Sequence, residues 1–115
     1  MAKFTINGTE LEFDILDADK AALYETGIEN IERVSNEVKN EQKLSVIVRK
    51  QCNAIFDFVN MLFGEGTDKK LFGDSTNLAA CMEVYFKILE EIPKDRVLLD
   101  NIAKKAQKPA AKKRA

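Results

Sequence analysis

A glycine-rich segment is the first place in the chain where residue types and spacing suggest chemistry. Phe63–Gly73 reads FGEGTDKKLFG. Glycine-rich loops bind phosphate through converging backbone N–H groups, with a lysine that reaches the terminal phosphate. The pattern GxxxxGK[ST] requires that lysine directly after its last glycine, whereas Lys69 and Lys70 follow Gly66 by three and four residues. The two acidic side chains of the segment would also repel an anion, so we interpret it as a joint between two helices.

The other reactive side chains form no recognisable site. Cys52 and Cys81 are 29 residues apart, each within an apolar run, and the absence of histidine excludes Ser/His and Cys/His nucleophilic systems. We interpret the thiols as buried small side chains rather than a redox pair or metal ligands. Asp17 and Asp19 are better explained as residues that begin a helix than as a metal site. We expect no catalytic residue, no metal site and no cofactor, and hence a protein that is not an enzyme.

The N-terminal residues around the first turn predict a β-hairpin over residues 3–14. Asn7-Gly8 is the preferred pair for a two-residue type I′ turn, because both positions need positive φ. That turn sets a register with Phe4 opposite Leu11, and Ile6 opposite Thr9, on an apolar face. A two-stranded hairpin is marginally stable alone, so we expect this face to pack on helices.

Helical spacing of apolar residues follows over most of the remaining sequence. Asp17 or Asp19 is expected to begin the first helix, Gly27 to permit close packing, and Asp74 or Ser75 to cap the third helix. The second helix is apolar on nearly all sides, so we expect it to be central. The predicted helices cover residues 18–39, 44–63, 76–92 and 94–107. The predicted fold class is mainly α: an N-terminal β-hairpin packed on a small bundle of three to four helices.

We expect specific helix caps within the joint. Gly64 and Gly73 are placed to end helices in the left-handed conformation, and Thr67 to N-cap one further turn. Phe63 and Phe72, each in a Leu-Phe-Gly tripeptide, are expected to plug the end of the core as a pair.

Length and composition predict one domain with a basic end. We assign residues 1–107 to a single globular domain and residues 108–115 to a flexible basic tail. The cations of the last twelve residues are Lys104, Lys105, Lys108, Lys112, Lys113 and Arg114, without an acid. The rest of the chain therefore carries −7, since the whole chain carries −1. The last helix offers a short apolar face, Leu98, Leu99 and Ile102, as a candidate partner-binding surface.

Four segments resemble a family of small proteins encoded in the tail-gene modules of tailed phages and prophages of Gram-positive bacteria. They are KFTINGTELEF, the D-A-D helix start, QCNAIFDFVNMLFGEGTDKKLFG and NLAACMEVYFKILEEI. The resemblance covers residues 3–92, and its most specific piece is Phe56–Gly73.

The resemblance implies a tail assembly chaperone, a non-catalytic protein that keeps the helical tape measure protein in solution until tube subunits assemble around it. The implied partners are the phage tape measure protein and the tail tube protein, with a homo-oligomer left open. No apolar run reaches the ~18 residues of a membrane span, and the N-terminal residues lack a signal-peptide core. We therefore expect a cytoplasmic protein without a membrane partner, and the resemblance implies the bacterial host cytoplasm as the location and absence from the mature virion.

The basic tail supports an alternative of a different class. Its cations are suited to nucleic-acid phosphates, which predicts a small nucleic-acid-associated or regulatory phage protein acting through residues 104–115. The tail lacks interleaved aromatic residues for stacking on bases, and the acidic body would repel a duplex. We therefore rank this alternative second.

Overall fold

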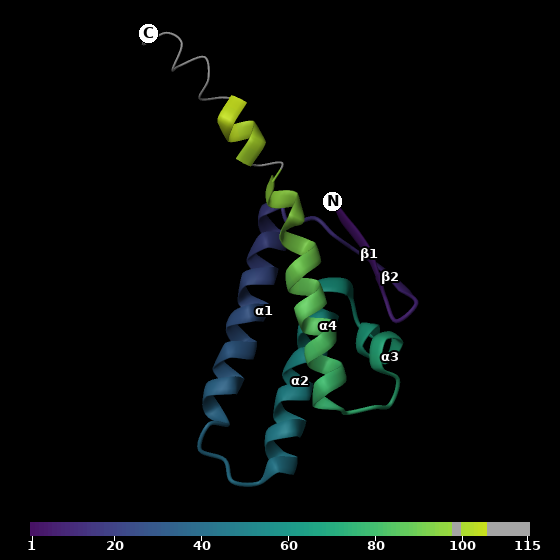
Figure 1. Cartoon of the computed structure of the whole chain (residues 1–115), viewed down its shortest axis with the longest axis vertical. Coiled ribbons are helices and arrows are strands. Elements are labelled where there is room, and N and C mark those ends of the chain that lie inside the picture. Colours follow the sequence, from purple (N-terminus) through teal and green to yellow (C-terminus); the bar gives the residue numbers. More distant parts are fainter. Residues whose placement is uncertain (98–99, 106–115) are drawn as a thin grey trace.

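The computed structural model describes residues 1–97 and 100–105, whose arrangement is shown in Figure 1. An antiparallel hairpin comes first, followed by helices, which confirms the predicted fold class. The elements are β1 (Ala2–Ile6), β2 (Thr9–Phe13), α1 (Ala18–Glu37), α2 (Leu44–Phe63), α3 (Thr67–Phe72), α4 (Leu78–Glu91) and the 3-10 helix η1 (Ile92–Asp95).

The hairpin has the predicted register. Phe4 pairs with Leu11 and Ile6 with Thr9, because Asn7 and Gly8 both have positive φ, 49° and 77°. Ile6 and Leu11 are buried, while the charged residues of the opposite face are exposed. The apolar face packs on α2 and α4, as a hairpin of marginal intrinsic stability requires.

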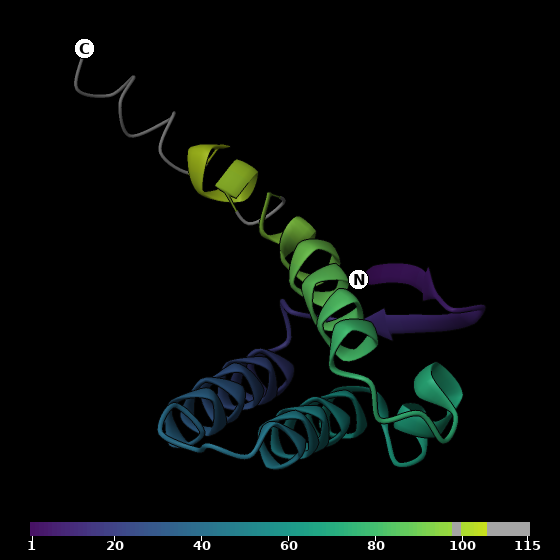
Figure 2. The same ribbon diagram turned by 60° about the horizontal axis from the view of Figure 1, so that its bottom comes forward.

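The helices form two layers, which Figures 1 and 2 show from different directions. The antiparallel pair α1 and α2 makes one layer, and α4 lies over α2 in the other. The hairpin and α3 lie on the same side of α4, away from α1. One flank of α4 is therefore covered by the hairpin, and the other faces α1.

The core is centred on α2, as its apolar sequence predicts. Phe58 is 1% exposed, and its ring lies 6.5 Å from that of Tyr24 on α1 and 5.3 Å from that of Tyr85 on α4. Gly27 allows α1 to approach, because a Cβ at this position would lie 2.5 Å from Cδ1 of Phe58. The predicted close packing at Gly27 is confirmed.

The helix ends match the predictions in part. Asp17 caps α1, with its Oδ2 accepting a hydrogen bond from the Lys20 N–H at 3.0 Å. The prediction for α4 was wrong: its cap is Asn77, whose Oδ1 accepts from the Ala80 N–H at 3.0 Å, so the helix begins at residue 78 rather than 76. The residues before Asn77 belong to the connecting loop. The first helix ends at residue 37 rather than 39, because the chain tightens there into short-range hydrogen bonds.

The caps predicted in the joint are right in position at the two glycines and wrong at Thr67, because Gly64 and Gly73 end α2 and α3 with positive φ. Gly64 has φ 109° and ψ 157°, and Gly73 has φ 62° and ψ −131°, so neither is in the left-handed helical conformation. Thr67 is the first residue of α3, and Gly66 precedes it in the left-handed conformation. The reason is a local hydrogen bond: the Thr67 hydroxyl donates back to the Gly64 carbonyl oxygen at 2.7 Å.

The two phenylalanines of the joint also differ from the prediction, because each has its own partners. Phe63 packs edge-on against the hairpin rings of Phe4 and Phe13, with centroids 6.1 and 6.0 Å apart. Phe72 packs against Phe56 at 5.3 Å. Each ring is partly exposed, whereas the leucine before each is buried and fills the end of the core.

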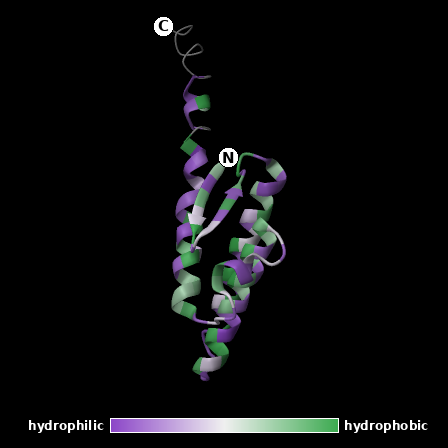
Figure 3. Ribbon diagram, turned by 90° about the vertical axis from the view of Figure 1, so that its right-hand side faces the viewer, coloured by the Kyte–Doolittle hydropathy of each residue, from purple (hydrophilic) through white to green (hydrophobic). Residues whose placement is uncertain are grey.

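The C-terminal helix was predicted to begin at residue 94, but residues 92–95 form the 3-10 helix η1. The chain continues from α4 through η1 and is helical at residues 96–97 and 100–105. Every described residue after Asp95 is exposed, and Figure 3 shows the helix of residues 100–105 as mainly hydrophilic with a hydrophobic portion. Residues 98–99 and 106–115, including the predicted tail 108–115, lie outside the described part. Among the described helices, none has the length and apolar character needed to cross a membrane.

Candidate functional site: a groove between three helices

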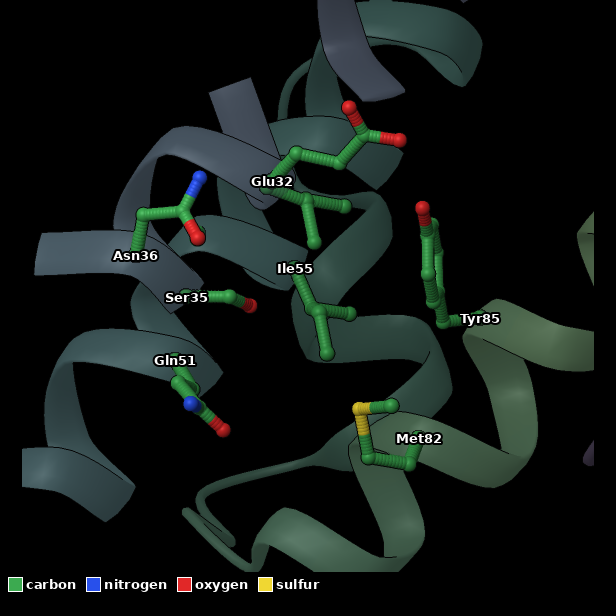
Figure 4. A pocket seen from close by; sticks show the side chains of 9 residues that line it. Glu32, Ser35, Asn36, Gln51, Ile55, Met82 and Tyr85 are labelled. Atoms are coloured by element: carbon green, nitrogen blue, oxygen red, sulfur yellow. The ribbon is translucent and has the colours of Figure 1, made fainter. Parts of the chain in front are cut away.

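A groove of about 390 Å³ opens between α1, α2 and α4. Figure 4 shows it at close range, with its side chains coming from all three helices. The lining residues are Ile31, Glu32, Ser35 and Asn36 on α1, Gln51, Ala54 and Ile55 on α2, and Met82 and Tyr85 on α4.

The layer arrangement explains why this groove stays open. The tip of the hairpin is tied to α3 by a hydrogen bond from Asn7 Nδ2 to the Leu71 carbonyl oxygen at 2.9 Å. The hairpin therefore covers one flank of α4, and its tip is held by α3, which packs on α2. In the part of the chain that the structure describes, no element covers the opposite flank, so the space between α4 and α1 remains open to solvent.

The groove has an apolar floor and one polar side. Ile55 and Ile31 are 1% and 8% exposed and form the floor, and the half-buried Met82 adds a flexible wall from α4. Ser35, Asn36 and Gln51 line the opposite side (Figure 4). An apolar floor with polar groups at its edge is typical of a surface that binds a partner side chain.

Tyr85, on α4, adds a phenolic hydroxyl to the lining of the groove. Burial raises the pKa of its phenol, and the nearby Glu32 carboxylate and Tyr24 phenol raise it further. The hydroxyl is therefore neutral at physiological pH and keeps its proton for donation. Glu32 extends its carboxylate on the same side of the groove, as Figure 4 shows.

The α4 wall continues beyond the groove as a partly exposed apolar strip. Met82, Phe86 and Leu89 lie three or four residues apart and so share one helical face. Phe86 is 58% exposed, although its ring lies 6.0 Å from that of Tyr85. A large aromatic ring exposed beside an apolar groove marks an interaction surface.

The α1 edge of the groove carries negative charge. Glu29, Glu32 and Glu37 line an adjoining hollow together with Arg33 and Asn36. Arg33 pairs with Glu37 at 2.6 Å, while neither Glu29 nor Glu32 has an ion-pair partner among the described residues. We refer to Glu29, Glu32 and Glu37 as the acidic shoulder. It favours a partner that brings positive charge beside its apolar side chains.

The two cysteines lie in the core, away from solvent. Cys52 and Cys81 are free thiols, each 0% exposed. Burial raises the pKa of the Cys81 thiol to about 12, with the neighbouring Cys52 as a smaller cause. The thiolate is the reactive form, so this thiol is inert at neutral pH. The described residues also contain no group of three or more His, Cys, Asp or Glu side chains arranged to hold a metal ion.

The joint has the hydrogen bonds of a structural element. The Asp68 N–H, at the start of α3, donates to Asn60 Oδ1 at 3.0 Å, and Thr67 uses its hydroxyl within the turn. Lys69 forms an ion pair with Asp74, with its Nζ 3.5 Å from Oδ1 of that carboxylate. Groups that a phosphate would need are therefore engaged by the protein itself, which supports the interpretation of Phe63–Gly73 as a joint.

Of the three partner-binding residues predicted from the sequence, the structure describes Ile102, which does not line the groove. Ile102 is 54% exposed on the C-terminal helix, and Lys104 and Lys105 are exposed beside it. The other predicted residues, Leu98, Leu99, Lys108, Lys112, Lys113 and Arg114, lie outside the described residues.

The groove itself was missed, because Glu32, Ser35 and Asn36 have the composition of an ordinary solvent face. The available signal was Phe86, a large ring on the side of its helix that also carries Glu83 and Lys87.

Comparisons with known proteins identify the family without a named function. No curated protein and no solved structure matches the chain. Residues 7–115 match the model of a family of unknown function, DUF6673, and the chain therefore belongs to this family.

Proposed function

We propose that this protein is a non-catalytic, helix-binding chaperone of the phage tail assembly kind. In this proposal the groove between α1, α2 and α4 holds an apolar helix of the tape measure protein. The observation that supports it most directly is the open groove, with the buried Ile55 as its floor and Met82 on its α4 wall, next to which Phe86 is exposed. Amphipathic helices bind such grooves through side chains spaced three or four residues apart.

The lining of the groove suits reversible binding. Ile31, Ile55 and Met82 offer apolar contact to one or two large side chains, while Ser35 and Gln51 keep its opposite edge hydrated. A chaperone has to release its client when assembly proceeds. A small apolar centre with a polar rim gives moderate affinity, because only the centre excludes water.

The identity of the client rests on the sequence resemblance, whose most specific piece is Phe56–Gly73. A tape measure protein is a long helical chain with exposed apolar faces, which need cover until tube subunits surround them. The protein would act in the bacterial host cytoplasm, contact the tail tube protein during assembly, and leave before the virion is complete.

The experiment is co-expression of this chain with a phage tape measure protein as the candidate client. The wild-type chain should keep the client soluble, and Phe86→Asp should weaken binding roughly tenfold or more, as loss of an aromatic anchor does. Leu44→Asp is the matched control, because Leu44 is 73% exposed at the far end of α2. Equal binding by both variants, or no effect of the wild-type chain on the client, would refute the proposal.

The gene provides a second test. A slippery heptamer near its end, an overlapping −1 frame and a tape measure gene directly downstream are expected for a tail assembly chaperone. Absence of all three would count against it.

The nucleic-acid alternative makes a different prediction. Lys104 and Lys105 are exposed, as contact with phosphates requires. If residues 104–115 bind nucleic acid, replacing their cations by serine should abolish binding, and the wild-type affinity should fall steeply with salt. A chaperone should hold its apolar client through both changes.

A further inference from the structure

We infer that the groove has a second occupant, the basic C-terminal segment of another copy of this chain, so that the free protein is a dimer. The segment comprises residues 96–115. This inference concerns the groove of the proposed function, but it does not depend on the identity of any client.

The segment has the chemistry that the groove and the acidic shoulder favour. Its exposed apolar residues include Val97 and Ile102, which are 61% and 54% exposed. It contains seven cations and one acid, while the rest of the chain is strongly acidic. Insertion would bring apolar side chains to Ile55 and Met82, and positive charge to Glu29 and Glu32.

The position of the segment favours insertion into the groove of a second copy over insertion into the groove of its own chain. The segment leaves the body after η1, where Ile92 is fully buried and Asp95 Oδ2 lies 3.0 Å from the amino group of Met1. From there the helix of residues 100–105 extends beyond the end of α4 (Figures 1 and 2). The groove lies toward the other end of α4, at Met82 and Tyr85. Insertion within one chain would require a reversal directly after this fixed point.

If each copy inserts its segment into the groove of the other, the assembly is complete at two copies. Each copy has one groove and one segment, so two copies related by a two-fold axis satisfy both pairs and leave neither segment exposed. The acidic bodies of two copies repel each other. Each inserted segment compensates this repulsion where it contacts the acidic shoulder, and added salt should therefore weaken the dimer.

Sedimentation velocity on the full chain, without any client, tests the inference. We expect a dimer for the wild-type chain and at least tenfold weaker association for the shoulder variant Glu29→Lys/Glu32→Lys. The segment variant Val97→Asp/Ile102→Asp should be weakened to the same degree. All four residues are exposed, so both variants should fold, which their circular dichroism checks. The matched control is Glu10→Lys/Glu65→Lys, which makes the same charge change at exposed positions on the hairpin and the joint.

A mixture of the two variants tests whether the dimer forms by insertion of segments into grooves or by another contact between the copies. The shoulder variant retains a normal segment and the segment variant retains a normal groove, so mixing them should restore association through one insertion. A monomeric wild-type chain would overturn the inference, as would a dimer that both variants leave intact or a mixture that stays monomeric. Because no client is present, these outcomes are independent of the test of the proposed function.

Discussion

Gly27→Ala should destabilise the protein, although alanine is the better helix former. In a helix interior, alanine is more favourable than glycine by up to ~1 kcal/mol. At Gly27, however, the added Cβ would lie 2.5 Å from Cδ1 and 2.8 Å from Cε1 of Phe58. Overpacking of a filled core costs ~1–3 kcal/mol, which exceeds the helical gain over most of its range.

The Phe58 ring has little room to move away from the new methyl group. It is 1% exposed, and the rings of Tyr24 and Tyr85 flank it at 6.5 and 5.3 Å. We therefore expect a net loss of about 1 kcal/mol in the free energy of unfolding. Urea denaturation monitored by circular dichroism measures it, and an unchanged m-value would assign the effect to stability.

Two further variants isolate the steric cause. Thr26→Ala, at an exposed neighbour on α1, should stabilise the helix by a few tenths of a kcal/mol, because it changes propensity without touching Phe58. Phe58→Leu should be destabilising alone, but its cost and that of Gly27→Ala should not add when combined, since the smaller side chain removes the clash. A stabilised Gly27→Ala chain, or additive costs in the double variant, would refute the reasoning.

Two other predictions concern the α4 cap and alkaline pH. Asn77→Ala should cost about 1 kcal/mol of unfolding free energy, because it removes the acceptor for the Ala80 N–H, whereas Ser75→Ala should change little; thermal denaturation compares them. Stability should also fall as pH rises above 9, since burial raises the pKa of Cys81 from 9.0 to about 12 and raises that of Tyr85. Such groups stabilise the fold fully below their unfolded pKa and lose that contribution as pH approaches the folded value. Urea midpoints should therefore fall between about pH 9 and about pH 12, and less so in Cys81→Ala; a flat profile would contradict this.

Local chemistry explains which parts of the fold were predictable. The hairpin register follows from Asn7-Gly8 alone, because a two-residue type I′ turn permits one pairing. The bounds of α2 follow from an apolar run between a polar loop and Gly64. The N-caps of α3 and α4 were not predictable to the same degree, because several residues that can cap a helix lie close together, Gly66, Thr67 and Asp68 around the start of α3 and Asp74, Ser75 and Asn77 before α4. Thr67 does not cap α3, because its hydroxyl donates instead to the carbonyl oxygen of Gly64, three residues earlier.

The groove depends on information that no single segment contains. Ile31, Ile55 and Tyr85 each lie on the apolar face of their helix, and each is buried. Whether the space above them is filled depends on which flank of α4 receives the hairpin. A pattern of apolar spacing identifies the inward face of each helix but does not say which neighbour covers it.

The glycine-rich joint decides that question, and this is how a segment without ligand chemistry contributes to a binding site. It reverses the chain after α2 and places α3 where the Leu71 carbonyl accepts from Asn7 at the tip of the hairpin. Phe63, at its start, packs against Phe4 and Phe13 of the two strands. These contacts hold the hairpin on one flank of α4, and the described residues supply no second element for the flank that faces α1. The residues that resemble a phosphate loop therefore determine where the groove lies, while the residues that line it come from the helices.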